Sequence, residues 1–378
     1  MWKSAFSKSL GAAPQRLHFA AHSHHLWPDV SFEAQQQAWL DAARLADEKW
    51  GHVFGEVIPR AQRHVAAELS LPDSSSVVFA PNTHELVLRL LSCLGPKPTI
   101  VTSDSEFHSF ERQTRRLEEE DLARVTRVPS EPFATFGERL VAASRGADLV
   151  FFSQVFFNSG AVVQDLAKII AALPASAMVV VDGYHGFCAV PTDWSALASR
   201  SFYVAGGYKY AMSGEGACFL HVPSSASELR PRNTGWFAAF GALEEKQAGR
   251  VPYAAGGGRF WGATFDPSGL YRFNAVMAWR QQARLTTAAV RAHAHALQTK
   301  FVAGLPAAAR ISASQLVVPL SDSARGQFLT FRTPDARELS AELLKRHVVT
   351  DARDDRLRFG FGPYLDDPDV AAVCRSLG

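Results

Sequence analysis

An aspartate and a lysine, each placed at or just after the end of a short apolar run, are the residues of this sequence with the clearest potential for chemistry. The run at 178–182 ends in Asp182, and Lys209 follows the run at 202–206. Both runs are rich in β-branched or aromatic residues, which predicts buried parallel strands. The carboxyl ends of such strands meet at one edge of a sheet, so the carboxylate and the amine would face one crevice. A carboxylate that holds a pyridinium nitrogen and a lysine that forms a Schiff base are the groups with which proteins bind pyridoxal 5′-phosphate (PLP).

The sequence around each of these two residues supports this interpretation and also leaves an alternative. Lys209 lies among small and aromatic residues at 206–216, where the backbone can approach a ligand and a partly desolvated amine becomes a nucleophile. The alternative is a surface lysine in a turn. Asp182 at the end of an apolar strand needs a cationic partner, which a pyridinium would provide. The alternative is a helix N-cap after the strand.

Other positions have residue types that suit a cofactor or an amino-acid substrate. His185 follows Asp182 closely and could contact the cofactor ring or a phosphate, or be a structural histidine. Asn82 and Thr83 start a predicted helix, whose first N–H groups bind phosphate, although a plain N-cap explains them equally. Arg358 lies on a predicted strand, where it could capture a substrate carboxylate or form an edge-strand salt bridge.

The histidines near the N-terminus do not have the spacing of a metal site. His18, His22, His24 and His25 lack an HExxH motif or a matching Cys/His set, so we expect no metal.

Composition limits the kinds of partner. The chain has 378 residues, 47% hydrophobic and 20% charged, which is typical of a globular protein with two domains. A net charge of +2 with both signs interspersed predicts no nucleic-acid partner. No apolar stretch approaches a membrane span, and the N-terminus lacks the apolar core of a secretion signal. The four cysteines form no CxxC pair, which predicts reduced thiols and a cytoplasmic protein. The small-molecule amino-acid substrate is expected from the PLP interpretation instead.

The alternation of strand and helix signals predicts an α/β fold. Strands are expected at 99–102, 149–152, 178–182, 201–205 and 217–222, with helices at 110–122 and 165–173 between them. Such alternation favours a sheet with helices on both faces. We expect residues 1–50 to form an N-terminal arm and helix that contribute to a small domain and the active site. Residues 51–268 would form the large cofactor-binding domain, and residues 269–378 a long linking helix, over about 270–301, and a small α+β domain. The loop-rich stretch 230–268 is typical of a functional or interface segment.

Several motifs show a resemblance to a known family. The chain resembles the fold type I PLP enzymes, in the class V aminotransferase group, and within that group kynureninase. The segment 207–217 is similar to the kynureninase Ser-Tyr-Lys-Tyr segment with its Gly-Pro-Gly-Ala continuation, and residues 182–185 match the family's Asp-x-x-His. The remaining similar segments are GWF at 235–237, LRFG at 357–360, PY at 363–364 and DV at 369–370. The resemblance implies a large domain with a mostly parallel mixed sheet flanked by helices, and a small C-terminal α+β domain.

The resemblance also implies roles for individual residues. Arg358 would bind the substrate α-carboxylate and Thr83 the cofactor phosphate. Phe107 would stack on the pyridine ring, while Ser153 and Tyr208 would complete the phosphate and ring contacts. Family members are homodimers with active sites at the subunit interface. Accordingly, Trp236 would reach the cofactor phosphate of the neighbouring subunit.

The sequence departs from the family on the substrate side. Residues 21–25 read AHSHH where kynureninases have Gly-Asn-Ser-Leu-Gly, and we assign His22 and Ser23 to the substrate pocket. The family's contact to the substrate aryl group falls near Thr264 or Asp266. We assign Thr264 to the cofactor side and Asp266 to the substrate side.

The sequence therefore predicts a PLP enzyme acting on an amino acid. The first hypothesis is kynureninase-like hydrolysis, in which Lys209 is the general base at Cα, Asp182 holds the pyridinium and Tyr208 donates a proton to the developing charge. The Cβ–Cγ bond would break to give alanine and an aryl acid. The alternatives are a class V aminotransferase or β-eliminating lyase, and a non-catalytic protein with the same fold.

Overall fold

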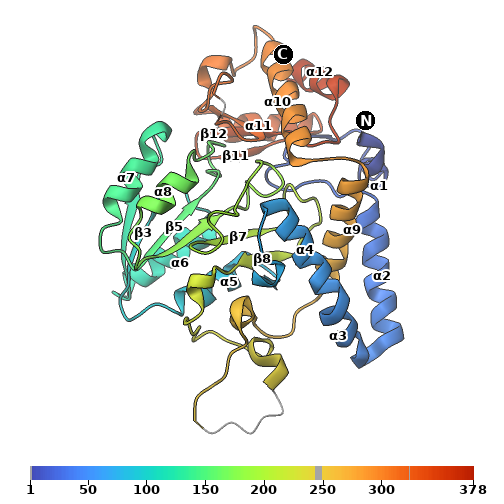
Figure 1. Ribbon diagram of the computed structural model, residues 1–378. Coiled ribbons are helices and arrows are strands. Elements are labelled where there is room, and N and C mark those ends of the chain that lie inside the picture. Colours follow the sequence, from blue (N-terminus) through green and yellow to red (C-terminus); the bar gives the residue numbers. More distant parts are fainter. Residues whose placement is uncertain (1, 243–248, 323) are drawn as a thin grey trace.

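The main sheet of the protein is a mixed sheet in which most neighbouring strands are parallel. The computed structural model describes residues 2–242, 249–322 and 324–378 (Figure 1). In these residues the sheet has seven strands in the order β2-β8-β7-β6-β5-β3-β4. Strand β8 runs antiparallel to β2 and β7, and the other neighbours are parallel. The strands are β2 (Val77–Ala80), β3 (Thr99–Ser103), β4 (Arg124–Val128), β5 (Leu149–Ser153), β6 (Met178–Asp182), β7 (Phe202–Gly206) and β8 (Cys218–His221). The predicted fold type, a mostly parallel mixed sheet flanked by helices, is confirmed.

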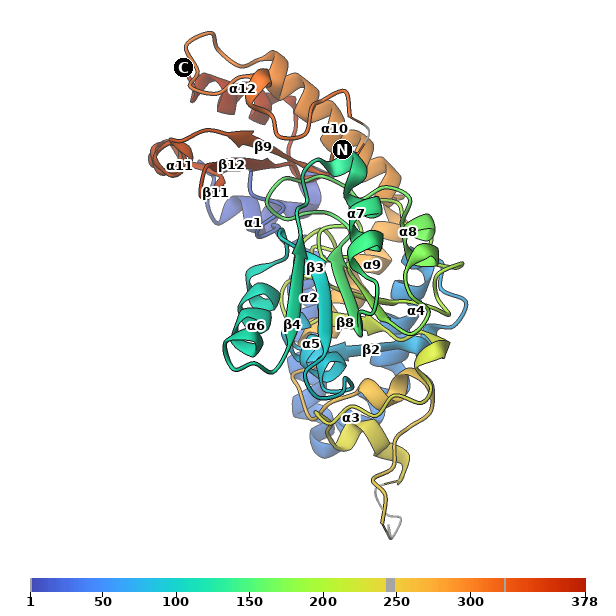
Figure 2. The ribbon, with the colours of Figure 1, turned by 90° about the vertical axis from the view of Figure 1, so that its left-hand side faces the viewer.

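The sheet is buried because helices cover both of its faces. Figure 2 shows α6 on one face and α7 and α8 on the other. Strands β5 and β7 are buried along their whole length, which explains their continuous apolar sequence. Burial of one valine or phenylalanine side chain contributes about 1.5–3 kcal/mol to the free energy of folding, so these strands stabilise the sheet that positions the site. The helices of this region are α4 (Ile58–Leu69), α5 (Thr83–Leu91), α6 (His108–Glu119), α7 (Phe136–Ala143) and α8 (Leu166–Ala172).

The C-terminal part of the chain forms a second, smaller α+β unit, at the top of Figure 1. Its antiparallel sheet has the order β11-β12-β9. The N-terminal strand β1 (Leu17–His18) pairs in parallel with β10, and Lys3 forms ion pairs with Asp366 and Asp369. The N-terminal arm thus packs on the C-terminal unit, while the domain boundaries themselves stay predictions. The elements of the unit are β9 (Phe328–Arg332), α11 (Ala336–Lys345), β10 (Val348–Val349), β11 (Asp351–Arg353), β12 (Arg356–Gly360) and α12 (Asp367–Arg375).

The linking helix expected over about 270–301 is two helices, so the prediction of one long helix was wrong. Helix α9 (Ser268–Gln282) ends before Arg284, whose φ of 51° lies in the left-handed region. The Thr286 hydroxyl then accepts a hydrogen bond from the Ala289 N–H and caps α10 (Thr287–Ala303). A left-handed residue followed by an N-cap turns the chain, which the alanine-rich periodicity does not reveal.

The remaining segments surround the sheet. Helices α1 (Ser7–Gly11), α2 (Val30–Leu45) and α3 (Lys49–His52) precede α4, and α2 packs along α9. In the described part of 230–268, the regular elements before α9 are the short 3-10 helices Trp236–Ala242 and Gly256–Phe260, as the loop-rich sequence predicts. Within the described residues, no helix has both the length and the apolar character needed to cross a membrane.

Candidate active site

The predicted site residues converge because several strands end at the same edge of the main sheet. Asp182 is the last residue of β6 and Ser153 the last residue of β5, and the two are paired in register. Lys209 follows β7 by three residues. Strand β2 is parallel to β7, since both are antiparallel to β8. The carboxyl end of β2 therefore lies at the same edge, and helix α5 begins there at Thr83. Ligands of open α/β sheets bind at such an edge.

A cavity of about 350 Å³ lies at this edge of the sheet. Pockets for small ligands occupy roughly 300–1,000 Å³, so the volume suits a cofactor. The predicted cofactor and catalytic residues that line the cavity are Asn82, Thr83, Phe107, Ser153, Asp182, His185, Tyr208 and Lys209. The structure therefore brings together residues from five separate segments, as the sequence predicts.

Lys209 is buried at the base of this cavity. Its Nζ lies 2.6 Å from Nε2 of His185, and it lies over the rings of Phe107 and Tyr184 at 5.5 and 4.9 Å. Burial lowers the pKa of Lys209 to about 7, although the Asp182 carboxylate acts in the opposite direction. A large part of the lysine is therefore neutral near pH 7, the form that attacks an aldehyde carbon. The surface-lysine alternative does not fit this environment.

Asp182 faces the same cavity from the end of β6. One of its carboxylate oxygens, Oδ1, accepts a hydrogen bond from the Tyr184 N–H at 2.8 Å. Burial raises the pKa of Asp182, while the Tyr184 N–H and the Lys209 charge act in the opposite direction. A buried carboxylate with so little compensation favours a cationic ligand group beside it.

The start of helix α5 is where a phosphate was predicted to bind. The Asn82 Oδ1 accepts a hydrogen bond from the Glu85 N–H at 3.0 Å, so Asn82 is the N-cap. Thr83 is the first helical residue and lines the cavity. The capping role is thus present, and backbone N–H groups beside Thr83 could still bind an anion. The phosphate contact of Thr83 stays a prediction.

Arg358 is buried on β12, and its guanidinium is already paired. Its Nη2 donates to the Asp351 carboxylate and its Nη1 donates to the carbonyl of Phe157, whose side chain lines the cavity. In the described residues its Nε has no hydrogen-bond partner. The salt bridge considered from the sequence is therefore present, although on the middle strand of the small sheet. The contact of Arg358 with a substrate carboxylate stays a prediction.

The N-terminal histidines have separate environments. His22 is fully buried, stacks on Phe328 at 4.6 Å, and its Nε2 lies 3.8 Å from the Asp351 carboxylate. His24 packs edge-on against Tyr208 at 5.2 Å. His25 lies against the Leu26 carbonyl, 2.7 Å away through its Nδ1. Ser23, between them, does not line the cavity, so the assignment of Ser23 and His22 to the substrate pocket stays a prediction.

Besides Arg358, His22 and Ser23, three further predicted residues do not line this cavity. The Trp236 Nε1–H donates to the Thr264 hydroxyl at 3.1 Å, and the Trp236 side chain is 43% exposed. Asp266 accepts hydrogen bonds from the N–H and the hydroxyl of Ser268 at the start of α9. None of the three lines the cavity of its own chain. Their roles toward a neighbouring subunit or a substrate stay predictions.

The sequence reasoning missed several residues that line the cavity. Tyr184, Phe157, His84 and Glu215 were not singled out. Tyr184 lies between Asp182 and His185, and its position two residues after the end of β6 could have indicated it. Cys218 also lines the cavity, and burial raises the pKa of its thiol to about 11. A thiol with that pKa is a poor nucleophile at neutral pH.

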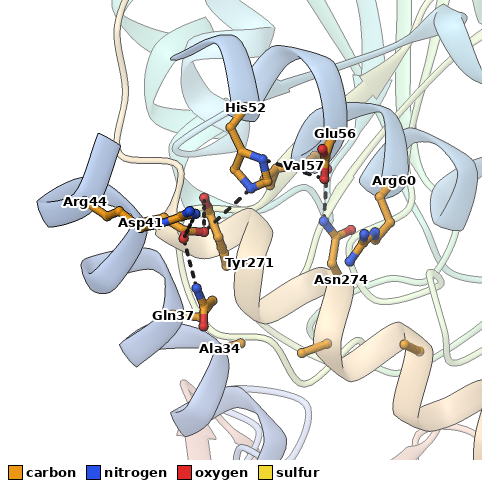
Figure 3. Close-up of a pocket in the computed structure, with 12 residues that line it drawn as sticks. Ala34, Gln37, Asp41, Arg44, His52, Glu56, Val57, Arg60, Tyr271 and Asn274 are labelled. Carbon is orange, nitrogen blue, oxygen red and sulfur yellow. Dashed lines mark hydrogen bonds and ion pairs between the residues drawn. The ribbon is translucent and has the colours of Figure 1, made fainter. Parts of the chain in front are cut away.

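A different cavity, of about 430 Å³, lies between α2, α9 and the segment that follows α3 (Figure 3). Asp41 is its central polar group and accepts hydrogen bonds from Gln37, Arg44 and Tyr271. These contacts satisfy the carboxylate and link α2 to α9. The cavity shares no lining residue with the Lys209 site.

Comparisons with known proteins agree with the geometry of the site. Residues 290–377 match the family model of the kynureninase C-terminal domain. A kynureninase of Deinococcus radiodurans is 26% identical over 350 residues, which are 87% of this chain and 82% of the relative. A probable cysteine desulfurase of Vibrio cholerae serotype O1 is 27% identical over 63% of this chain and 59% of the relative.

The fold matches solved structures over nearly the whole chain. One is the complex between the cystine C-S lyase C-DES and its reaction product cysteine persulfide, with a TM-score of 0.81 and 18% identity. It covers 97% of this chain and 98% of that chain. The apo cysteine desulfurase of Thermococcus onnurineus NA1 has a TM-score of 0.79 and 16% identity, with 98% and 96% coverage.

The fold and these matches identify the class of the protein: it is a PLP-dependent enzyme of fold type I, in the class V aminotransferase group, that acts on an amino acid. Within that group the predicted resemblance to kynureninase is confirmed by the family model and by the curated relatives.

The cavity of this chain fits PLP. Asp182 is a buried carboxylate that favours a cation, as a protonated ring nitrogen would be. In the described part of the chain, the buried Nδ1 of His185 has no hydrogen-bond partner, so it is available to a ligand. The start of α5 opens into the same cavity and suits a phosphate. Lys209 would hold the cofactor's aldehyde carbon and Asp182 its ring nitrogen.

Proposed function

We propose that this enzyme hydrolyses the Cβ–Cγ bond of a kynurenine-type amino acid, which gives alanine and an aryl acid. The observation that carries the proposal is the meeting of Lys209 and Asp182 in one aromatic-walled cavity of a chain whose matches include kynureninases. In this reaction a water oxygen bonds to the γ-carbonyl carbon, the Cβ–Cγ bond breaks, and a proton is delivered to Cβ.

The cofactor, when bound, supplies an electron sink that stabilises negative charge at the substrate carbon. The residues of the chain transfer the protons and stabilise the charges. The Lys209 amine, with a pKa of about 7, can take the proton from Cα and return one later. Asp182 would stabilise a proton on the ring nitrogen of the bound cofactor. Burial raises the pKa of Tyr208, so its hydroxyl stays protonated and can donate to charge that develops on the substrate.

The walls of the cavity suit an aryl side chain. Phe107, Phe157, Tyr184 and Tyr208 line it, and the rings of Phe107 and Phe157 pack edge-on with centroids 5.8 Å apart. Aromatic side chains prefer such offset or edge-on contacts with another ring, which contribute about 0.5–1.5 kcal/mol per pair.

A second candidate is β-elimination or transamination by the same residues. The similarity to a probable cysteine desulfurase favours this alternative. Against a desulfurase in particular, Cys218 is the cysteine at the cavity, and burial raises the pKa of its thiol. A persulfide acceptor needs a reactive thiolate, which this environment does not favour.

The proposal includes a cytoplasmic homodimer with shared active sites. The Trp236–Thr264 pair is exposed on the loop-rich segment and would complete the neighbour's phosphate site. Sedimentation of the purified holoenzyme as a monomer at all concentrations would contradict the dimer.

The reaction itself is tested with the purified holoenzyme and three substrates. We expect kynurenine to yield anthranilate fluorescence, with alanine in equal amount and no build-up of the pyridoxamine form. An amino donor alone should give no stable pyridoxamine spectrum, and cysteine should release no sulfide at a comparable rate. Pyridoxamine build-up without anthranilate would instead support transamination, and sulfide release would support β-elimination.

Replacement of Arg358 with alanine should raise KM for the substrate and leave the cofactor spectrum intact. A lost charge-assisted hydrogen-bond pair corresponds to about 10- to 100-fold in binding. The measurement is kcat and KM together with the absorption spectrum.

Asp351→Asn is the matched control for Arg358→Ala, because it also breaks the Arg358–Asp351 pair but keeps the guanidinium. Equal KM changes in both variants would mean that Arg358 acts only as the partner of Asp351. A lost cofactor spectrum in Arg358→Ala would show that its role lies on the cofactor side.

A further inference from the structure

Glu106 is a buried carboxyl group beside the cavity that the proposed mechanism does not use. It is 4% exposed and lies in the loop between β3 and α6, next to Phe107. Its backbone thus belongs to the segment that carries an aromatic wall of the site. Buried carboxyl groups need hydrogen-bond partners or a cation, so the contacts of Glu106 determine which protonation state it has.

The contacts of Glu106 are all with uncharged groups. Its Oε1 accepts hydrogen bonds from the Ser103 hydroxyl and, at 3.1 Å, from the Ser153 N–H. Its Oε2 lies 2.6 Å from the Ser153 Oγ. Ser103 Oγ also accepts from the Ser105 N–H at 3.1 Å, so the Ser103 hydroxyl proton is left for Glu106. Among the described residues, no cation forms an ion pair with Glu106.

The Asp182 charge opposes the ionisation of Glu106. Asp182 is the last residue of β6, and Lys209 and His185 line the cavity together with it. On its own loop, Asp104 accepts a hydrogen bond from the Ser130 N–H. Burial and, to a lesser extent, the Asp182 charge raise the pKa of Glu106 to about 8, against the hydrogen bonds from Ser103 and Ser153. The neutral acid is therefore the main form at pH 7.

We propose that Glu106 holds a proton and thereby turns the Ser153 hydroxyl toward the cavity, which makes Glu106 a positioning residue for the cofactor. Both acceptor directions at Oε1 are occupied, so the proton lies on Oε2 and is donated to Ser153 Oγ. The Ser153 hydroxyl, which lines the cavity, is then free to donate to an oxygen of the ligand. The inference rests on the proposed PLP site.

Loss of the Glu106 proton reverses the hydrogen bond. Ser153 then donates to Oε2 and presents only lone pairs to the cavity. An anionic oxygen of the ligand then has no hydrogen-bond donor at Ser153. It is also repelled by the negative charge of Glu106, in addition to that of Asp182. The affinity for such a ligand should therefore fall as pH rises through about 8.

Binding of pyridoxine 5′-phosphate to the apoenzyme tests this inference. This compound lacks the aldehyde, so it reports the site without a covalent bond to Lys209. By calorimetry between about pH 6.5 and 9.5, the wild-type affinity should fall about tenfold, the effect of one hydrogen bond that involves a charged group. In Glu106→Gln the amide donates permanently to Ser153, so the part of this fall near pH 8 should disappear, and only the part caused by loss of the Lys209 charge near pH 7 should remain. Ser153→Ala should lose the part near pH 8 too, with weaker binding at low pH.

The unfolding free energy of the apoenzyme gives a second readout that needs no ligand. The native pKa of Glu106 lies above its ordinary value of 4.5, so its contribution to stability is lost as pH rises from about 4.5 to about 8. Wild type should therefore lose stability relative to Glu106→Gln across this range.

The possible outcomes distinguish a failure of the proposed PLP site from a failure of the Glu106 inference. No binding of pyridoxine 5′-phosphate by the folded wild type would contradict the PLP site, and the unfolding comparison would still test the proton on Glu106. An unchanged pH profile in Glu106→Gln, or parallel unfolding curves, would overturn the inference. If Glu106→Gln does not fold, a wild-type pH profile in Ser153→Ala overturns it instead.

Discussion

Replacement of Lys209 with alanine should abolish the visible absorbance of the purified protein and lower kcat by about 10³-fold, the range of a lost general base. The physical reason is that, among the residues that the structure describes, Lys209 is the one lysine in the cavity lining, which otherwise contains histidines as basic groups. Without this amine the cofactor is not held covalently and the Cα proton is not transferred. Absorption spectra and steady-state kinetics with kynurenine measure the two effects.

A suitable control is Lys97→Ala. Lys97 pairs with Asp121 just before β3, at the amino ends of the parallel strands. It should keep both the spectrum and the activity. A Lys209→Ala protein that retains the absorbance, or turns over at the wild-type rate, would contradict the whole site and revive the interpretation of a different or non-catalytic protein.

Replacement of Asp182 with asparagine should lower kcat by about 10²-fold, as for the loss of one preorganised electrostatic group. Asparagine is close to aspartate in size but cannot stabilise a proton on the ring nitrogen. Because Lys209 is intact, the protein should still show visible absorbance, with a shifted maximum. The variant thus separates attachment of the cofactor from its activation.

Asp148→Asn serves as the matched control for Asp182→Asn. Asp148 precedes β5 and accepts a hydrogen bond from the Thr99 N–H, at the opposite edge of the sheet. Its loss should not change kcat. Wild-type turnover in Asp182→Asn would show that the carboxylate serves only as a structural group after the strand, the alternative considered from the sequence.

Much of the candidate site could be predicted because it depends on strand ends. A run of β-branched residues predicts a buried strand, and the polar residue that ends it must lie at the sheet edge. Asp182 and Ser153 follow this rule, and Lys209 and Thr83 lie a few residues beyond their strands. Their convergence needed only the parallel arrangement that the strand and helix alternation predicts.

The contacts between distant segments could not be predicted in this way. The pairing of Arg358 with Asp351 depends on the register of two antiparallel strands, in which these residues are direct neighbours. The burial of Glu106 depends on how one loop folds under the end of β5. Neither follows from residue type, because a glutamate before a helix is usually exposed.

The amino-acid order by itself determined the class of fold and the position of the two groups proposed to hold the cofactor, since hydrophobic periodicity is local and the carboxyl ends of parallel strands lie at one edge of the sheet. Only the three-dimensional packing decided where α9 gives way to α10, which arginine is already neutralised, and which carboxyl keeps its proton. Those properties depend on desolvation and on partners that are far apart along the chain, and such effects leave no periodic signal in a sequence.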